Sequence, residues 1–235
     1  MGIAVVTFFY ARSLAFLVRI KSEFRNTPEI WNVPKPLIPD PIAISVAKPP
    51  MVSYFGYEFE SPTSEVKEEQ KTETVVALNF ADCAGMAILK PRPSGILAQI
   101  IEQGPPETGR NFEEVYGKDA VRSDYVLRQK ILNMTPRDLS LFAWPRQITR
   151  NSILLMLKGV ESQRFKNGLY RFETPSVHGF LEGDLALDPG VVIEAFDHED
   201  HLLTLVVGRK PGKSCFGSSE LNRIIFSLRP SPATE

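Results

Sequence analysis

The sequence predicts an α+β fold, in which an antiparallel sheet carries helices packed on it and a hydrophobic N-terminal helix precedes the sheet. Short strand-like runs occur in pairs around turn residues, and such pairs indicate hairpins. Helix-like segments group in the middle of the chain between two blocks of strands, as expected of an α+β domain. With 43% hydrophobic and 23% charged residues, the chain has the composition of a folded globular protein.

An apolar stretch at residues 2–18 opens the chain, and Arg12 interrupts it. A membrane-spanning helix needs about 20 apolar residues, and a central arginine costs roughly 2.5–3.5 kcal/mol on insertion. The stretch also lacks the basic start and the cleavage site of a signal peptide. We expect a single N-terminal membrane anchor, with the side of the membrane left open. The alternatives are an interfacial amphipathic helix, a buried packed helix, and a late start that truncates a longer span.

The chain divides by composition into four ranges. Residues 1–20 form the hydrophobic helix, the candidate membrane anchor. Residues 21–50 form a proline-rich linker, or a strap laid over the domain, because proline removes a backbone donor and fixes φ. Residues 51–230 form the α+β domain, and residues 231–235 form a disordered tail.

The first block of strands follows the proline-rich range. Residues 51–60 are rich in strand-forming aromatic side chains around Gly56. The polar residues 61–73 are expected to form an exposed loop. Residues 74–80 and 84–90 are two β-prone runs separated by a short turn, which predicts a hairpin.

Helical periodicity dominates the middle of the chain. A short helix is expected over residues 95–103, and Leu127, Ile131 and Met134 recur at the spacing of a buried helix stripe. Thr135 before a proline is a helix start, because the hydroxyl caps the first turn and proline fits its first position. A longer helix from about 146 to 160 carries a stripe of Ile153, Leu157 and Val160.

The last third of the chain returns to strands. A polar tip at residues 197–200 lies between β-branched runs and predicts a hairpin. Ser218 and Ser219 cap a closing helix, and Pro230 stops it. The strands are expected at residues 169–173, 177–182, 191–196 and 201–207.

The order of these elements resembles a known fold group. A strand pair near Tyr57-Glu58-Phe59, central helices, a late hairpin and a closing helix over 219–230 are similar to the Mog1/PsbP-like α/β/α sandwich. The resemblance covers about residues 51–230 and is one of layout. Proteins of that group are mostly non-catalytic binding or assembly modules, some of them on membranes, so the resemblance implies a binding role. It assigns no functional residue.

Two short motifs resemble known sites but lack the required spacing. Residues 208–214 resemble a phosphate-binding loop, yet three residues rather than four separate Gly208 from Gly-Lys-Ser. A solvated basic loop is expected there. Residues 197–201 (Asp-His-Glu-Asp-His) concentrate metal-ligating groups, but neighbouring residues of a strand point to opposite faces. We therefore expect an exposed turn and no metal.

The sequence offers no setting for a serine or cysteine nucleophile. No GxSxG motif occurs, and neither Cys83 nor Cys215 has a histidine near it in the sequence. The two cysteines are expected to be reduced core thiols. A long-range disulfide is the alternative if the domain faces an oxidising compartment.

Trp144, Arg146 and Arg150 are the candidate partner-binding residues. Tryptophan and arginine dominate the binding energy of many interfaces. The alternative is that Trp144 fills the core at a helix junction.

These patterns favour a non-enzymatic, membrane-tethered binding or assembly module without cofactor. Its partner would be a protein or a small ligand, and a net charge of −1 argues against nucleic acid. The alternative is a hydrolase-type enzyme with a site assembled from distant residues, in which His178, His198 or His201 handles the proton. A third alternative is a soluble protein whose N-terminal helix packs on the domain.

Overall fold

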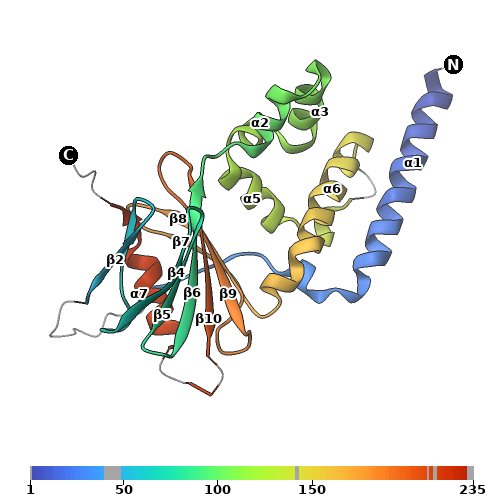
Figure 1. Cartoon of the computed structure of the whole chain (residues 1–235). Helices are drawn as coiled ribbons and strands as arrows, with labels where there is room; N and C mark the ends of the chain where they lie inside the picture. Colours follow the sequence, from blue (N-terminus) through green and yellow to red (C-terminus); the bar gives the residue numbers. More distant parts are fainter. Residues whose placement is uncertain (1, 40–48, 141–142, 211, 214–215, 232–235) are drawn as a thin grey trace. The chain divides into compact units, whose positions relative to one another are not determined.

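The computed structural model describes residues 2–39, 49–140, 143–210, 212–213 and 216–231 (Figure 1). The chain forms two compact units. The helical unit comprises residues 1–34 and 94–166, and the sheet unit comprises residues 35–93 and 167–235. Each unit is built from two separated stretches of chain, an arrangement that consecutive sequence ranges do not describe.

An eight-stranded sheet forms the centre of the sheet unit (Figure 1). Every neighbouring pair is antiparallel except the parallel pair at one edge, β1 with β7. The predicted α+β class with an antiparallel sheet is therefore confirmed. In spatial order the strands are β1 (Lys35–Pro36), β7 (Leu169–Glu173), β8 (His178–Glu182), β9 (Gly190–Phe196), β10 (Leu202–Arg209), β6 (Ala84–Arg92), β5 (Val75–Phe80) and β4 (Val66–Lys71).

A smaller sheet and one helix complete the sheet unit. This sheet has the order β11 (Arg229–Pro230), β3 (Tyr57–Glu60) and β2 (Met51–Tyr54). Phe55 and Gly56 turn the β2–β3 hairpin with φ of 53° and 80°, a conformation in which glycine carries no steric cost. Helix α7 (Ser218–Ser227) packs its apolar stripe into the same core as the strands. Among the fully buried members of this core are Val76, Phe80, Ile193, Leu205, Val207, Phe216, Ile224 and Ile225.

The predicted hairpins at 74–90 and 191–207 are confirmed, and the strand-prone residues 51–60 form the β2–β3 hairpin. The expected loop at 61–73 is wrong, because residues 66–71 form strand β4 at the edge of the large sheet. Nearly all of its side chains are exposed, so β4 has no alternating apolar pattern that sequence reasoning could detect. It is held instead by main-chain pairing with β5.

Cys83 is buried in the core of the sheet unit, and it is disulfide-bonded. The expectation of two reduced thiols is therefore wrong for Cys83. Cys215 and the tail beyond residue 231 lie outside the described residues.

The helical unit contains α1 (Gly2–Glu23), α2 (Ile96–Gln103), α3 (Pro106–Tyr116), α4 (Lys118–Arg122), α5 (Asp124–Asn133) and α6 (Pro145–Glu161). Helices α2, α5 and α6 lie where periodicity predicted helices. The expected helix start at Thr135 produces only a single 3-10 turn, Pro136–Asp138. There the amide and hydroxyl of Thr135 both donate to Asp138 Oδ2 at 2.8 Å. Three further 3-10 turns are Phe24–Asn26, Pro28–Trp31 and Ser162–Phe165.

Helix α1 packs along α6 in a parallel orientation (Figure 1). Leu17 and Ile20 are fully buried in the second core of the molecule, together with Leu155 of α6. At the far end, a Cβ placed on Gly159 would lie 2.4 Å from the ring of Phe24. Residues 14–24 thus match the buried-helix alternative. In the part of the chain that the structure describes, no helix is long and apolar enough to cross a membrane.

A buried lysine joins three segments of the helical unit. Lys158 is 0% exposed, and its Nζ donates to the carbonyl oxygens of Leu132 (2.8 Å) and Met134 (2.7 Å) and to that of Asn32. The first two carbonyls end helix α5, where a cation complements the helix dipole. Burial lowers the pKa of Lys158 to about 8, and the charge of Asp138 opposes this shift.

The expected stripe on α6 faces outward. Leu157 is partly exposed and Val160 is 82% exposed, whereas Lys158 and Leu155 point inward. The periodicity of α6 was therefore recognised correctly, but its packed face was not, because α1 and the carbonyls around Lys158 occupy the opposite side.

Candidate functional site

The first turns of α6 carry all three candidate binding residues. Trp144 is the N-cap of α6, and Pro145 stands at the first helical position, where a missing amide has no cost. Trp144 is 80% exposed, so the alternative in which it fills the core is wrong. Arg146 and Arg150 follow one turn apart, and both are exposed. We call Trp144, Arg146 and Arg150 the basic-aromatic surface.

In the part of the chain that the structure describes, both arginines have only weak contacts. Arg146 Nη1 lies 3.8 Å from Glu114 Oε1, and both side chains are widely exposed. Such an ion pair contributes about 0–1 kcal/mol. Arg150 Nε contacts the neutral amide oxygen of Asn151 at 3.4 Å. The two guanidinium groups can therefore bind an external anion without losing a strong partner among the described residues.

The basic-aromatic surface lies at the end of α6 that is nearest to the N-terminal part of α1 (Figure 1). Ala143 precedes Trp144 and packs in the same cluster as Leu14. Before Leu14, Ala11 and Arg12 are exposed. Figure 1 shows the first turns of α1 continuing past the beginning of α6. The surface therefore lies near the N-terminal part of α1, on the same side as the exposed Arg12 turn.

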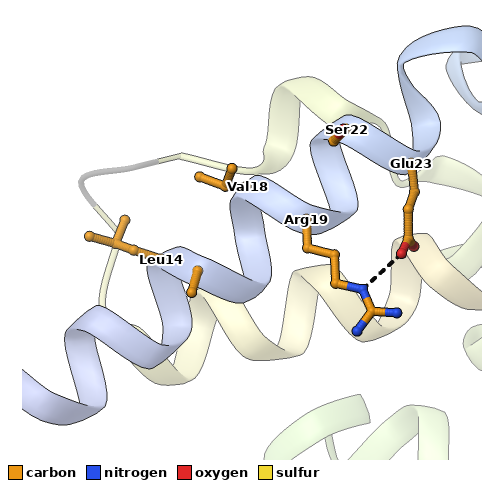
Figure 2. Close-up of a pocket in the computed structure, with 6 residues that line it drawn as sticks. Leu14, Val18, Arg19, Ser22 and Glu23 are labelled. Carbon is orange, nitrogen blue, oxygen red and sulfur yellow. Dashed lines mark hydrogen bonds and ion pairs between the residues drawn. The ribbon is translucent and has the colours of Figure 1, made fainter.

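A shallow hollow of about 710 Å³ lies along the outer face of α1 (Figure 2). Val18 is an exposed lining residue, and an ion pair between the lining residues Arg19 (Nε) and Glu23 (Oε1) spans 2.8 Å. All of its described lining comes from this one helix, so it is an open face rather than an enclosed substrate pocket. The lining residues are Leu14, Ala15, Val18, Arg19, Ser22 and Glu23.

A second cluster of polar groups lies in the sheet unit, around Asp197. Tyr57 of β3 donates its hydroxyl to Asp197 Oδ2 at 2.6 Å. Asp197 Oδ1 accepts the backbone amides of Glu199 and His201, each at 2.9 Å. His201 Nδ1 lies 3.2 Å from Asp197 Oδ2. We call Tyr57, Asp197 and His201 the Asp197 cluster.

The Asp197 cluster favours an ionised carboxylate beside a neutral phenol. Burial and then the carboxylate of Asp197 raise the pKa of Tyr57. Burial also opposes ionisation of Asp197, but hydrogen bonds from Tyr57 and His201 outweigh it and lower the pKa of Asp197. The carboxylate therefore closes the β9–β10 turn and orients the His201 ring.

The three histidines of the chain have different surroundings. His178 stacks on Phe196 with ring centroids 6.3 Å apart, and burial lowers its pKa. His198 Nε2 lies 3.0 Å from the carbonyl oxygen of Pro175. Only His201 contacts Asp197 among the described hydrogen bonds. The described residues contain no group of three or more histidine, cysteine or carboxylate side chains placed to hold a metal ion.

The loop that resembles a phosphate-binding motif is tied to the β5–β6 turn. Lys210 pairs with Asp82, and the Lys210 amide donates to the Cys83 carbonyl at 2.9 Å. The ion pair lowers the pKa of Asp82. Residues 211, 214 and 215 lie outside the described part of the chain.

Comparison with known proteins identifies no relative: no family model, no curated protein and no solved structure matches this chain. Its function is therefore inferred from the geometry of the two units.

Proposed function

We propose that this protein is a non-enzymatic binding or assembly module held at a membrane surface by the first half of α1 (residues 2–10). The proposal is supported by the length of this helix and by its apolar sequence. The described side chains from Leu14 onward include those that pack on α6, and before Leu14 the helix extends back to Gly2 with a mostly apolar sequence. The apolar residues of that sequence are Ile3, Ala4, Val5, Val6, Phe8, Phe9 and Tyr10.

The length of this segment suits insertion into one leaflet. Nine helical residues rise by about 14 Å, roughly half of a hydrocarbon core of about 30 Å. Each large apolar side chain that leaves water contributes roughly 1.5–3 kcal/mol. Arg12 would then lie at the level of the headgroups, where its guanidinium meets phosphate instead of hydrocarbon. The arginine that disfavours a full span is compatible with this shallower mode.

Two deletions of different length test the tether. Removing residues 2–10 should abolish flotation of the purified protein with phospholipid vesicles and leave the melting temperature unchanged, because the described packing begins at Leu14. Removing residues 2–20 also deletes the buried Leu17 and Ile20, and should destabilise the helical unit. Equal flotation of the full chain and the shorter deletion would contradict the proposal.

The partner of the module is a protein or a small ligand, and the layout resemblance to the Mog1/PsbP-like group supports a binding role. Chemical cross-linking in the native cell, followed by detergent extraction and co-purification, tests this part. A stoichiometric partner recovered from the membrane fraction is the expected result. Recovery of the protein alone from the soluble fraction would argue against both the tether and the partner.

A second candidate function is acid–base catalysis at the Asp197 cluster. The specific observation is the orientation of His201 by a buried carboxylate, which leaves Nε2 as the ring nitrogen directed away from it. A panel of activated ester and phosphoester substrates tests this reading with His201→Ala, using His198→Ala as the matched control. Hydrolysis lost only in His201→Ala would favour the enzyme, and no hydrolysis by the unmodified protein would exclude it for these substrates.

A further inference from the structure

We propose that the basic-aromatic surface is a second membrane contact, in which Trp144 inserts at the headgroup level and Arg146 and Arg150 bind anionic lipid phosphates. The inference rests on the proposed function, because it takes the first half of α1 as the primary anchor. It adds a lipid class and names the residues that recognise it.

The basic-aromatic surface lies near the part of α1 that we propose enters the membrane. Ala143 and Leu14 both pack against the second core, and α1 runs parallel to α6 with Phe24 beside Gly159, so Trp144 lies toward the N-terminal end of α1. If the helix before Leu14 enters the bilayer, the next level of the protein meets the headgroups. The basic-aromatic surface occupies that level, together with the exposed Arg12.

The exposed side chain of Trp144 is chemically suited to the membrane–water interface. Tryptophan favours the membrane–water interface, because its ring is apolar and its N–H needs a polar partner. Trp144 is 80% exposed and has the requirements of such a residue. The other tryptophan, Trp31, instead lies against the guanidinium of Arg137, 5.3 Å from its ring centroid.

The positive charges of Arg146 and Arg150 suit the phosphate groups of anionic lipids. The side chain of Arg146 is 89% exposed, and its only described ion pair, with Glu114, is long. Arginine binds phosphate oxygens with two parallel donors. The net charge of the chain is only −1, so a general attraction to anionic lipid is absent and the preference must come from a local patch.

The proposed anchor in α1 is short and needs a second membrane contact for stable binding. A single short apolar insertion gives marginal and reversible binding, and stable anchoring takes a second signal such as a basic patch. The first half of α1 is such a short insertion. The two arginines, each worth about fivefold in affinity for an anionic surface, would provide the second signal.

Tryptophan fluorescence of the full-length protein tests the insertion. The chain has two tryptophans, so Trp31→Phe leaves Trp144 as the single reporter, and Trp144→Phe leaves Trp31 as the matched control. With vesicles of phosphatidylcholine and phosphatidylglycerol, the emission of Trp31→Phe should shift to the blue and be quenched by brominated acyl chains. The emission of Trp144→Phe should not change.

Charge variants test the lipid class. Arg146→Gln/Arg150→Gln should weaken binding to the anionic vesicles roughly 30-fold and leave the weaker binding to pure phosphatidylcholine unchanged. Lys67→Gln/Lys71→Gln changes the net charge equally on β4 of the sheet unit, and should have little effect. Circular dichroism and thermal melting establish that each variant is folded.

The outcomes separate this inference from the proposed function. Vesicle binding that depends on residues 2–10 but leaves Trp144 emission unchanged would keep the tether and overturn the second contact, leaving the surface to a protein partner. Equal loss of binding in both double charge variants would also overturn it. Absence of vesicle binding by the unmodified chain would overturn both proposals.

Discussion

Replacing Lys158 with methionine removes the charge at the centre of the helical unit and keeps most of the side-chain volume. Lys158 is 0% exposed and donates to three carbonyl oxygens. A buried carbonyl that loses its donor costs about 2 kcal/mol, so the three together cost roughly 6 kcal/mol. Removing the charge of Lys158 has the opposite effect on stability, because a buried ammonium group destabilises the fold. A pKa of about 8 against the ordinary 10.5 corresponds to roughly 3 kcal/mol of penalty for keeping the ammonium protonated in the fold. We therefore expect Lys158→Met to lower the free energy of unfolding by roughly 3 kcal/mol at pH 7.

The pH dependence of this effect follows from the sign of the pKa change. The unfolded chain binds the Lys158 proton more tightly than the folded chain does, so the stability of the unmodified protein rises between pH 8 and 10.5. The gain is lost as pH falls through 8. Lys158→Met lacks this titration, and its deficit should grow from roughly 3 to roughly 6 kcal/mol over that range. Tyrosine titrations occur in both proteins and cancel in the difference.

Urea unfolding followed by tryptophan emission is the appropriate assay, because Trp31 and Trp144 both belong to the helical unit. Lys130→Met is the matched control, since Lys130 Nζ donates to one carbonyl, that of Tyr116 at 3.0 Å. Its cost should be roughly 1 kcal/mol. A deficit for Lys158→Met that stays constant from pH 7 to 10 would refute the lowered pKa. Stability equal to that of the unmodified protein at pH 7 would refute the role of Lys158 in joining the three segments.

Three further substitutions probe the packing of each unit. Gly179→Ala should destabilise the sheet unit by more than about 3 kcal/mol in denaturant unfolding, because its Cβ would lie 1.9 Å from the carbonyl oxygen of Glu194. Gly159→Ala should lower the stability of the helical unit by roughly 1–3 kcal/mol, measured by tryptophan emission, because the new methyl group displaces the Phe24 ring. Asp197→Asn should lower stability at pH 7 by roughly 1–3 kcal/mol. Since the lowered pKa of Asp197 makes its contribution present above about pH 4 and lost in more acidic solution, the deficit should shrink when unfolding is repeated toward pH 3. Deficits that are absent at Gly159 and Gly179, or independent of pH at Asp197, would contradict these assignments.

Local signals in the sequence were sufficient for most elements of the fold. The hairpins at 74–90 and 191–207 follow from β-prone runs on either side of turn residues, and helix α6 follows from its periodicity. Each signal involves residues close in the chain, and each is strong because one face of the element is buried. The exposed edge strand β4 has no buried face, so its main-chain pairing with β5 could not be read from side-chain pattern.

At the candidate sites too, the sequence did not predict contacts between residues that are distant in the chain. The sequence identified Trp144, Arg146 and Arg150 as a group, but whether Trp144 fills the core or faces solvent depended on what packs around the first turn of α6. Likewise the sequence placed Asp197 and His201 in one turn, whereas Tyr57 reaches that turn from a strand 140 residues away.

The sequence by itself determined the kind of most elements, where the hairpins at 74–90 and 191–207 turn, and the apolar character of the first residues of α1. The tertiary structure decided that Leu17 and Ile20 of this helix are buried, that Lys158 points inward and Val160 outward, and that each unit is assembled from two stretches of chain. The physical reason is that propensity and periodicity act within a few residues. The choice of a buried face instead depends on which distant side chains and carbonyl groups compete to occupy it.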